Sequence, residues 1–150
     1  MKKIYIILIP VFIFLLTGCN KNKTLVCTRN NETTNNVLIS SEANIEYNDE
    51  KIINIKIETI TDLSKTNLLN DEFVESLIRS SKETTKKLED KSGITAVYEK
   101  TDVGVKYTLT VKYDELKDDE LNDLDPKLYN KTIKIEDLKS GYLKDWTCNN

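Results

Sequence analysis

Apolar and polar residues alternate in several short stretches of the chain, which is the pattern of half-buried β-strands. The clearest alternation runs over residues 103–113, where Val, Tyr or Leu occupies every second position. A second covers residues 37–47, and a third has isoleucine at each odd position of 53–57. The turn-forming sequence Asn48-Asp49-Glu50 lies between these two and predicts that they form a β-hairpin.

Two more strands complete the predicted sheet. Residues 94–98 alternate in the same way, and a turn at 101–104 joins them to the 103–113 strand as a second hairpin. The remaining strand begins at Thr24-Leu25-Val26-Cys27. We therefore expect an antiparallel sheet of about five strands.

Between the two hairpins, apolar residues recur at helical spacing. Asn70 can cap a helix whose first turn carries Asp71 and Glu72, charges that suit the helix dipole. The apolar stripe covers one face only and consists of Phe73, Val74, Leu77, Ile78 and Leu88. Because a one-sided helix and a one-sided sheet bury each other, the pattern predicts an α+β fold with one main helix on one face.

The pattern is weaker after Tyr113. Residues 114–124 are polar, and we expect them to form a helix that stops before Pro126. Residues 133–135 are expected to be extended, and residues 135–144 to form a short helix interrupted near Gly141. With no internal repeat and no low-complexity linker, residues 24–150 are predicted to be a single domain.

The first residues form a different kind of segment. Lys2 and Lys3 precede an apolar run over residues 4–16, which has the layout of a secretory signal peptide and is short for a bilayer span. The run ends in Leu16-Thr17-Gly18-Cys19, which resembles the bacterial lipobox, where the cysteine receives a diacylglycerol and the signal is cut before it. An ordinary signal peptide cut elsewhere and a retained membrane helix are the alternatives.

The lipobox resemblance implies a boundary, a modification and a location. Residues 1–18 would be the signal peptide, Cys19 the lipidated residue with acyl chains such as palmitate, and residues 19–23 the tether. The extracytoplasmic face of a bacterial cell membrane is then the expected location, with the membrane as a partner through the lipid anchor. Two or three acyl chains hold a protein stably, since each buried methylene contributes about 0.8 kcal/mol.

Charge and composition exclude several functions. The chain has 22 Lys+Arg and 25 Asp+Glu, and removal of Lys2 and Lys3 leaves 20 against 25, a formal charge of −5. An acidic chain with interleaved basic residues lacks the basic stripe that nucleic-acid binding needs. With no histidine, the usual general base and metal ligand are missing. We therefore predict no catalytic residue, no metal site and no cofactor.

Two cysteines besides Cys19 remain, Cys27 and Cys148. In a non-reducing compartment a disulfide between them is the simplest interpretation. A pair of reactive thiols or a metal site is the alternative, although two cysteines without histidine make a poor zinc centre.

The acidic run over residues 114–125 is the most suggestive polar cluster, because calcium prefers carboxylate ligands. Leu121 and Leu124 break the spacing of a calcium loop, and a solvated acidic segment explains the same residues. A divalent-cation-responsive module and an envelope hydrolase that uses Asp or Glu carboxylates remain as alternative functions.

Several short motifs resemble those of the YehR-like bacterial lipoproteins, a group of small proteins classed as a domain of unknown function. They are the strand Thr24-Leu25-Val26-Cys27-Thr28 close behind the lipobox, the hairpin end Asp62-Leu63-Ser64, and a tail with Leu138, Tyr142 and Cys148. In that family glycine and tyrosine directly precede the last cysteine, whereas Gly141-Tyr142 here lies six residues ahead of it. The resemblance implies a fold and a location but no activity. The expected function is a non-enzymatic binding or interaction module, held close to the membrane, for a protein or small ligand that the sequence does not identify.

Overall fold

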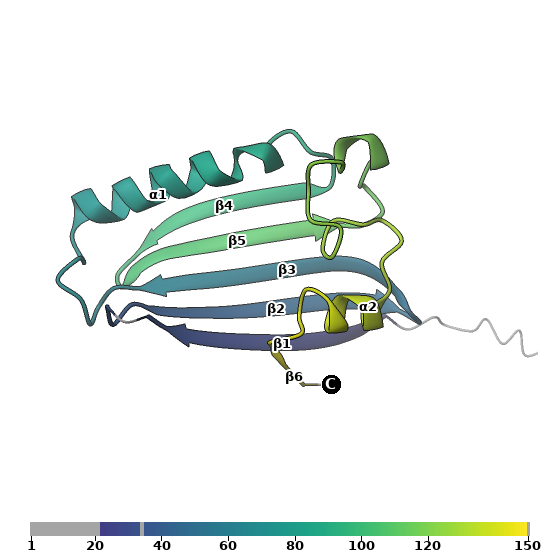
Figure 1. Ribbon diagram of the computed structural model, residues 1–150, viewed down its shortest axis with the longest axis horizontal. Coiled ribbons are helices and arrows are strands. Elements are labelled where there is room, and N and C mark those ends of the chain that lie inside the picture. The colour runs from purple at the N-terminus through teal and green to yellow at the C-terminus, as the bar shows by residue number, and fades with distance from the viewer. Residues whose placement is uncertain (1–21, 34, 150) are drawn as a thin grey trace, which may run out of the picture.

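The computed structural model describes residues 22–33 and 35–149. In this part of the chain, six antiparallel strands form one sheet in the order β4-β5-β3-β2-β1-β6 (Figure 1). Their bounds are β1 Lys23–Glu32, β2 Leu38–Asn48, β3 Lys51–Asp62, β4 Ile94–Thr101, β5 Gly104–Lys112 and β6 Thr147–Asn149. Both predicted hairpins are present, and β3 pairs with β5 to join them. The predicted α+β class is confirmed.

The strand count differs from the prediction of about five. Among the described residues the sixth strand, β6, is three residues long and pairs with β1 at the edge of the sheet. A strand this short has too few residues for an alternation to be visible in the sequence. Its position is fixed by its partner, because Cys148 lies directly opposite Cys27.

The two faces of the sheet differ in polarity. The inner face carries the buried apolar residues, and one row of them crosses the sheet through Leu25, Ile45, Ile55, Val111 and Ile94. The adjacent row on the outer face is mostly polar and runs through Val26, Asn44, Lys56, Thr110 and Thr95. An antiparallel sheet can keep one face in water in this way, so only the inner face needs covering.

A β-bulge in the β2–β3 hairpin corrects one detail of the predicted alternation. The isoleucine pattern places Ile53 on the inner face, but the register shifts between Glu46 and Tyr47 and Ile52 is the buried residue instead. Ile53 falls outside the pairing of the two strands and stays partly exposed. An extra residue in one strand reverses the inside-outside alternation beyond it, which a period of two cannot anticipate.

Helix α1, Asp71–Thr85, begins where the sequence predicts. The side chain of Asn70 accepts a hydrogen bond from the Phe73 N–H at 2.9 Å, and two acidic residues lie in the first turn. The helix lies along β4 and β5 (Figure 1). Its buried residue Val74 belongs to a small apolar cluster with Leu63 and Val105.

The C-terminal segment, residues 113–146, covers another part of the inner face with little regular structure. The prediction of a helix over 114–124 is wrong, because within this described stretch only Asp118–Glu120 forms a 3₁₀ turn. Leu116 and Leu124 are nevertheless buried, so turns alone bring these side chains into the core. The helix predicted further on is present as α2, Ile135–Ser140, which ends before Gly141.

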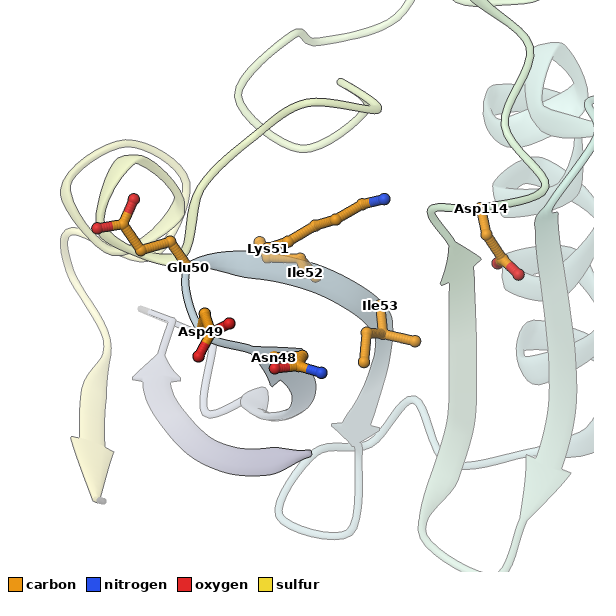
Figure 2. Close-up of a pocket in the computed structure, with 7 residues that line it drawn as sticks. All are labelled: Asn48, Asp49, Glu50, Lys51, Ile52, Ile53 and Asp114. Carbon is orange, nitrogen blue, oxygen red and sulfur yellow. The ribbon is translucent and has the colours of Figure 1, made fainter. Parts of the chain in front are cut away.

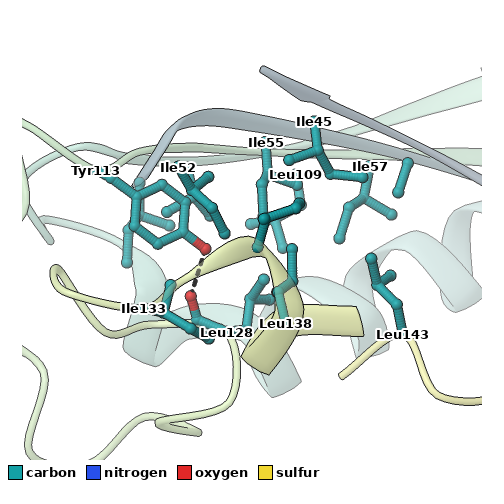
Figure 3. Packing of buried hydrophobic residues seen from close by; sticks show 14 of the residues in the cluster. Ile45, Ile52, Ile55, Ile57, Leu109, Tyr113, Leu128, Ile133, Leu138 and Leu143 are labelled. Carbon is teal, nitrogen blue, oxygen red and sulfur yellow. Dashed lines mark hydrogen bonds between the residues drawn. The ribbon is translucent and has the colours of Figure 1, made fainter. Parts of the chain in front are cut away.

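The main core lies between the inner face and the C-terminal segment. Figure 3 shows leucine and isoleucine side chains of that segment facing those of the sheet, among them Leu128, Ile133, Leu138 and Leu143 against Ile45, Ile55, Ile57 and Leu109. Tyr113 is 1% exposed and donates a hydrogen bond from its hydroxyl to the backbone oxygen of Leu128 at 2.6 Å. Burial raises the pKa of Tyr113, so the phenol remains a neutral donor.

We expect Tyr113→Phe to lower the free energy of unfolding by about 1–2 kcal/mol, because it removes the donor to a buried carbonyl oxygen and leaves the ring in place. Urea unfolding followed by circular dichroism measures the change. Tyr47→Phe is the matched control, since no hydrogen bond of its hydroxyl is found among the described residues, and its expected effect is within about 0.5 kcal/mol. Equal effects of the two substitutions would contradict the role of the Tyr113 hydroxyl.

Candidate functional site

The edge of the sheet is closed by a disulfide between Cys27 and Cys148. Cys27 is fully buried in β1, and the bridge encloses a separation of 121 positions. The predicted structural bridge is therefore confirmed. The displacement of Gly141-Tyr142 from the last cysteine does not prevent it, because the chain turns at Leu143, whose oxygen accepts the Trp146 N–H at 2.9 Å, and returns as β6.

An aromatic pair lies beside this bridge. Trp146 and Tyr142 have ring centroids 6.4 Å apart, and both pack against the main core while remaining partly exposed. The guanidinium carbon of Arg29 lies 5.0 Å from the centroid of the Trp146 ring, a cation–π contact. These three residues connect the last turn of the chain to β1.

A hollow of about 640 Å³ lies at the β2–β3 turn, and we call it the tether-end hollow because β1 begins at the same end of the sheet (Figure 2). Its lining comes from the turn, from the start of β3 and from the second residue after β5: Asn48, Asp49, Glu50, Lys51, Ile52, Ile53 and Asp114. The Glu50 carboxylate pairs with Lys134 at 2.6 Å, and this hydrogen bond holds the pKa of Glu50 below its ordinary value. Ile52 and Ile53, the latter displaced by the bulge, add apolar surface beside the polar side chains of the turn.

A second hollow, of about 380 Å³, lies on the outer face and is called the outer-face hollow. It spans four strands and is lined by Thr28, Asn30, Ser40, Ser41, Glu42, Glu58, Ile60 and Lys106. Glu42 and Glu58 stand directly opposite each other on β2 and β3, where like charges repel. Lys106 and Lys56 both pair with Glu58, and the hydrogen bond from Lys106 is the main cause that lowers the pKa of Glu58. Glu58 is therefore an acceptor at neutral pH and a poor proton donor.

Two acidic residues of 114–125, Glu120 and Asp123, hold the C-terminal segment to its neighbours. The Glu120 carboxylate accepts hydrogen bonds from the backbone and side chain of Ser92 at 2.6 and 3.2 Å. Asp123 pairs with Lys91 at 3.1 Å, and Asp125 accepts the Lys127 N–H at 2.9 Å. In the described part of the chain, no group of three or more His, Cys, Asp or Glu residues is placed to hold a metal ion.

Cys19 and the rest of the predicted signal and tether up to residue 21 lie outside the described residues. Among the helices that are described, none is long and apolar enough to cross a membrane.

No protein-family model matches the chain, and no curated protein matches its sequence. Two solved structures share its architecture. The NMR structure of the E. coli YehR protein matches with a TM-score of 0.57 at 11% identity, over 87% of this chain and 92% of that one. The NMR structure of a protein from Streptococcus pneumoniae TIGR4 matches with a TM-score of 0.52 at 11% identity, over 99% of this chain and 96% of that one.

The chain has the YehR fold. The resemblance that the short motifs indicate is thereby confirmed, and at 11% identity it concerns the fold alone. The chemistry of this YehR-fold domain must therefore be argued from its own side chains.

Three features of this YehR-fold domain are absent from the sequence prediction: the opposed pair Glu42 and Glu58, its partner Lys106, and the Arg29 contact with Trp146. Each depends on strand register or on the path of the last turn. The alternation of polar residues along each strand is the only sequence signal for the outer-face residues. It predicts which face a residue lies on, but not which residues of the next strand stand beside it.

For this YehR-fold domain we expect loss of the disulfide, in Cys27→Ser with Cys148→Ser, to lower the free energy of unfolding by about 2–4 kcal/mol. Chemical denaturation measures the change. Thiol titration of the native protein carrying Cys19→Ser should find no free thiol. Two titratable thiols in that variant would contradict the bridge.

A pH effect is expected at Glu58. Because its pKa is lowered in the folded state, the ionised Glu58 carboxylate stabilises the fold fully at pH values above 4.5, the ordinary pKa of the group. This contribution is lost as the pH falls through the lowered pKa of the folded state. Lys106→Met should raise the pKa of Glu58, as measured by carboxyl NMR titration. Lys112→Met, on the same strand and face but paired with Glu115, is the control and should leave Glu58 unchanged. An unchanged Glu58 pKa in both variants would exclude Lys106 as the cause.

Proposed function

We propose that this chain is a lipid-anchored, non-enzymatic binding module on the extracytoplasmic face of a bacterial membrane. The observation that carries the proposal is the lysine-led apolar run ending in Leu16-Thr17-Gly18-Cys19. Residues 1–18 would be removed as a signal peptide, residues 19–23 would form the tether, and residues 24–150 would form the binding domain.

The start of the fold supports a position close to the lipid. Asn22 is already hydrogen-bonded to Glu46 at 2.6 Å, and β1 begins at Lys23. Three residue steps separate Cys19 from Asn22, which is at most about 11 Å of extended chain. The end of the sheet with the β2–β3 turn would therefore face the headgroups, and the tether-end hollow would lie near the membrane surface.

The carboxylates favour binding over hydrolysis. A glycosidic acid catalyst needs a raised pKa, whereas the pKa of Glu58 and that of Glu50 are both lowered by lysine partners. Glu120 and Asp123 are engaged in fixing the C-terminal segment. The outer-face hollow instead offers ionised acceptors and hydroxyl groups, which suit recognition of a polar partner.

We expect Cys19→Ser to abolish both labelling with palmitate and recovery in the membrane fraction, because it removes the thiol that receives the lipid. Cys27→Ser with Cys148→Ser is the matched control and should remain labelled and membrane-bound. A Cys19→Ser product that is cut at the same place and still fractionates with membranes would contradict the anchor. Release of soluble fragments from purified cell wall by the pure protein would contradict the proposal that the domain is not an enzyme.

A further inference from the structure

One row of inner-face side chains interrupts the apolar core with polar groups. Strand register places Arg29, Ser41, Thr59, Tyr107 and Tyr98 opposite one another on β1, β2, β3, β5 and β4, and we call them the polar row. The main core under the C-terminal segment lies on one side of the row, and the small cluster under α1 lies on the other. Ser41 is buried, while the other four residues are partly exposed.

Arg29 supplies a charge without a counter-charge. No ion pair or side-chain hydrogen bond of Arg29 is found within residues 22–33 and 35–149, and its Nε is buried without a hydrogen-bond partner. A buried donor left unpaired destabilises the fold, so an anion that paired with the guanidinium would be favoured. The guanidinium carbon lies over the Trp146 ring, 5.0 Å from its centroid, and four N–H groups besides Nε remain as possible donors to a planar anion.

The neighbours of Arg29 add hydrogen-bond donors and flat apolar surface. The hydroxyls of Ser41 and Thr59 are 3.0 Å apart and share one hydrogen bond, which leaves one hydroxyl hydrogen for a third group. Tyr107 and Tyr98 are stacked with ring centroids 4.7 Å apart. Burial raises the pKa of Tyr107 in the row and that of Tyr142 near Arg29, so these phenols stay neutral and add no negative charge to the site.

We propose that the polar row is a binding site for the carboxylate of a small ligand, held by the Arg29 guanidinium and the Ser41–Thr59 hydroxyls, with the ring or apolar body of the ligand against Tyr107. Arginine offers a planar bidentate fork that matches a carboxylate. This inference rests on the binding role proposed above and names the ligand class for it. It does not depend on the lipid anchor.

Trp146 is the single tryptophan of the chain and makes a cation–π contact with Arg29, so its fluorescence reports on the site. The probe is benzoate, titrated into the lipidated protein in detergent up to millimolar concentration, with benzamide as the neutral control of the same shape. We expect a saturable fluorescence change with benzoate and none with benzamide. Arg29→Gln should weaken benzoate binding by about tenfold or more, since it removes the charged hydrogen bonds.

Arg79, the other arginine of the chain, lies exposed on α1, and Arg79→Gln is the matched control, with the same loss of charge and unchanged benzoate binding expected. Arg29→Lys should also weaken binding, because an ammonium group lacks the fork. Urea unfolding of each variant verifies that it is folded. The proposal is overturned if native protein shows no saturable change, if Arg29→Gln binds benzoate like the native chain, or if inorganic phosphate binds as tightly as benzoate. Any of these results leaves the anchor untouched, because labelling at Cys19 tests that separately.

Discussion

The structure depends on burying one face of a single twisted sheet. The β2–β3 and β4–β5 hairpins build an inner face of Ile, Leu and Val, and the hydrophobic effect requires that other parts of the chain cover it. Helix α1 does this over β4 and β5 with regular structure, while the C-terminal segment does it with turns. The backbone hydrogen bonds of these turns are local, so contacts between more distant residues hold the segment in place: the Tyr113 hydroxyl on Leu128, the Glu120 carboxylate on Ser92, and the disulfide just after its end.

Helix α1 and the C-terminal segment cover the inner face in two separate parts, and the polar row lies between them. The apolar clusters under α1 and under the C-terminal segment do not merge completely, and the sheet presents polar side chains between them. A continuous apolar core would be more stable at this row, since an unpaired guanidinium nitrogen away from water is costly. The outer face is different, because its charges are opposed by lysines and remain near solvent, where such pairs contribute little to stability.

The sequence predicts the regular elements well because period and capping are local properties. The Asn70 cap, both hairpins and α2 lie where the residues indicate. The sequence-based prediction is wrong where contacts between distant parts of the chain determine the local structure. Residues 114–124 bury two leucines without forming a helix, and Ile52 replaces Ile53 in the core because a bulge shifts the register. The sequence predicts the Cys27–Cys148 bridge from the cysteine count and the expected compartment. The roles of Arg29 and of the opposed Glu42 and Glu58 depend on how the strands are aligned.

The position of the disulfide has a mechanical consequence under the proposed attachment through the N-terminus. Tension applied at the anchor would reach β1 first and could peel away only Lys23–Val26 before the load passed into the covalent bond at Cys27. From there the pull is shared with β6 at the other end of the chain, and the 121-position loop between the sulfurs is shielded from direct extension. Under the proposed anchoring, the residues between the two cysteines would therefore keep their arrangement while tension acts on the two ends of the chain.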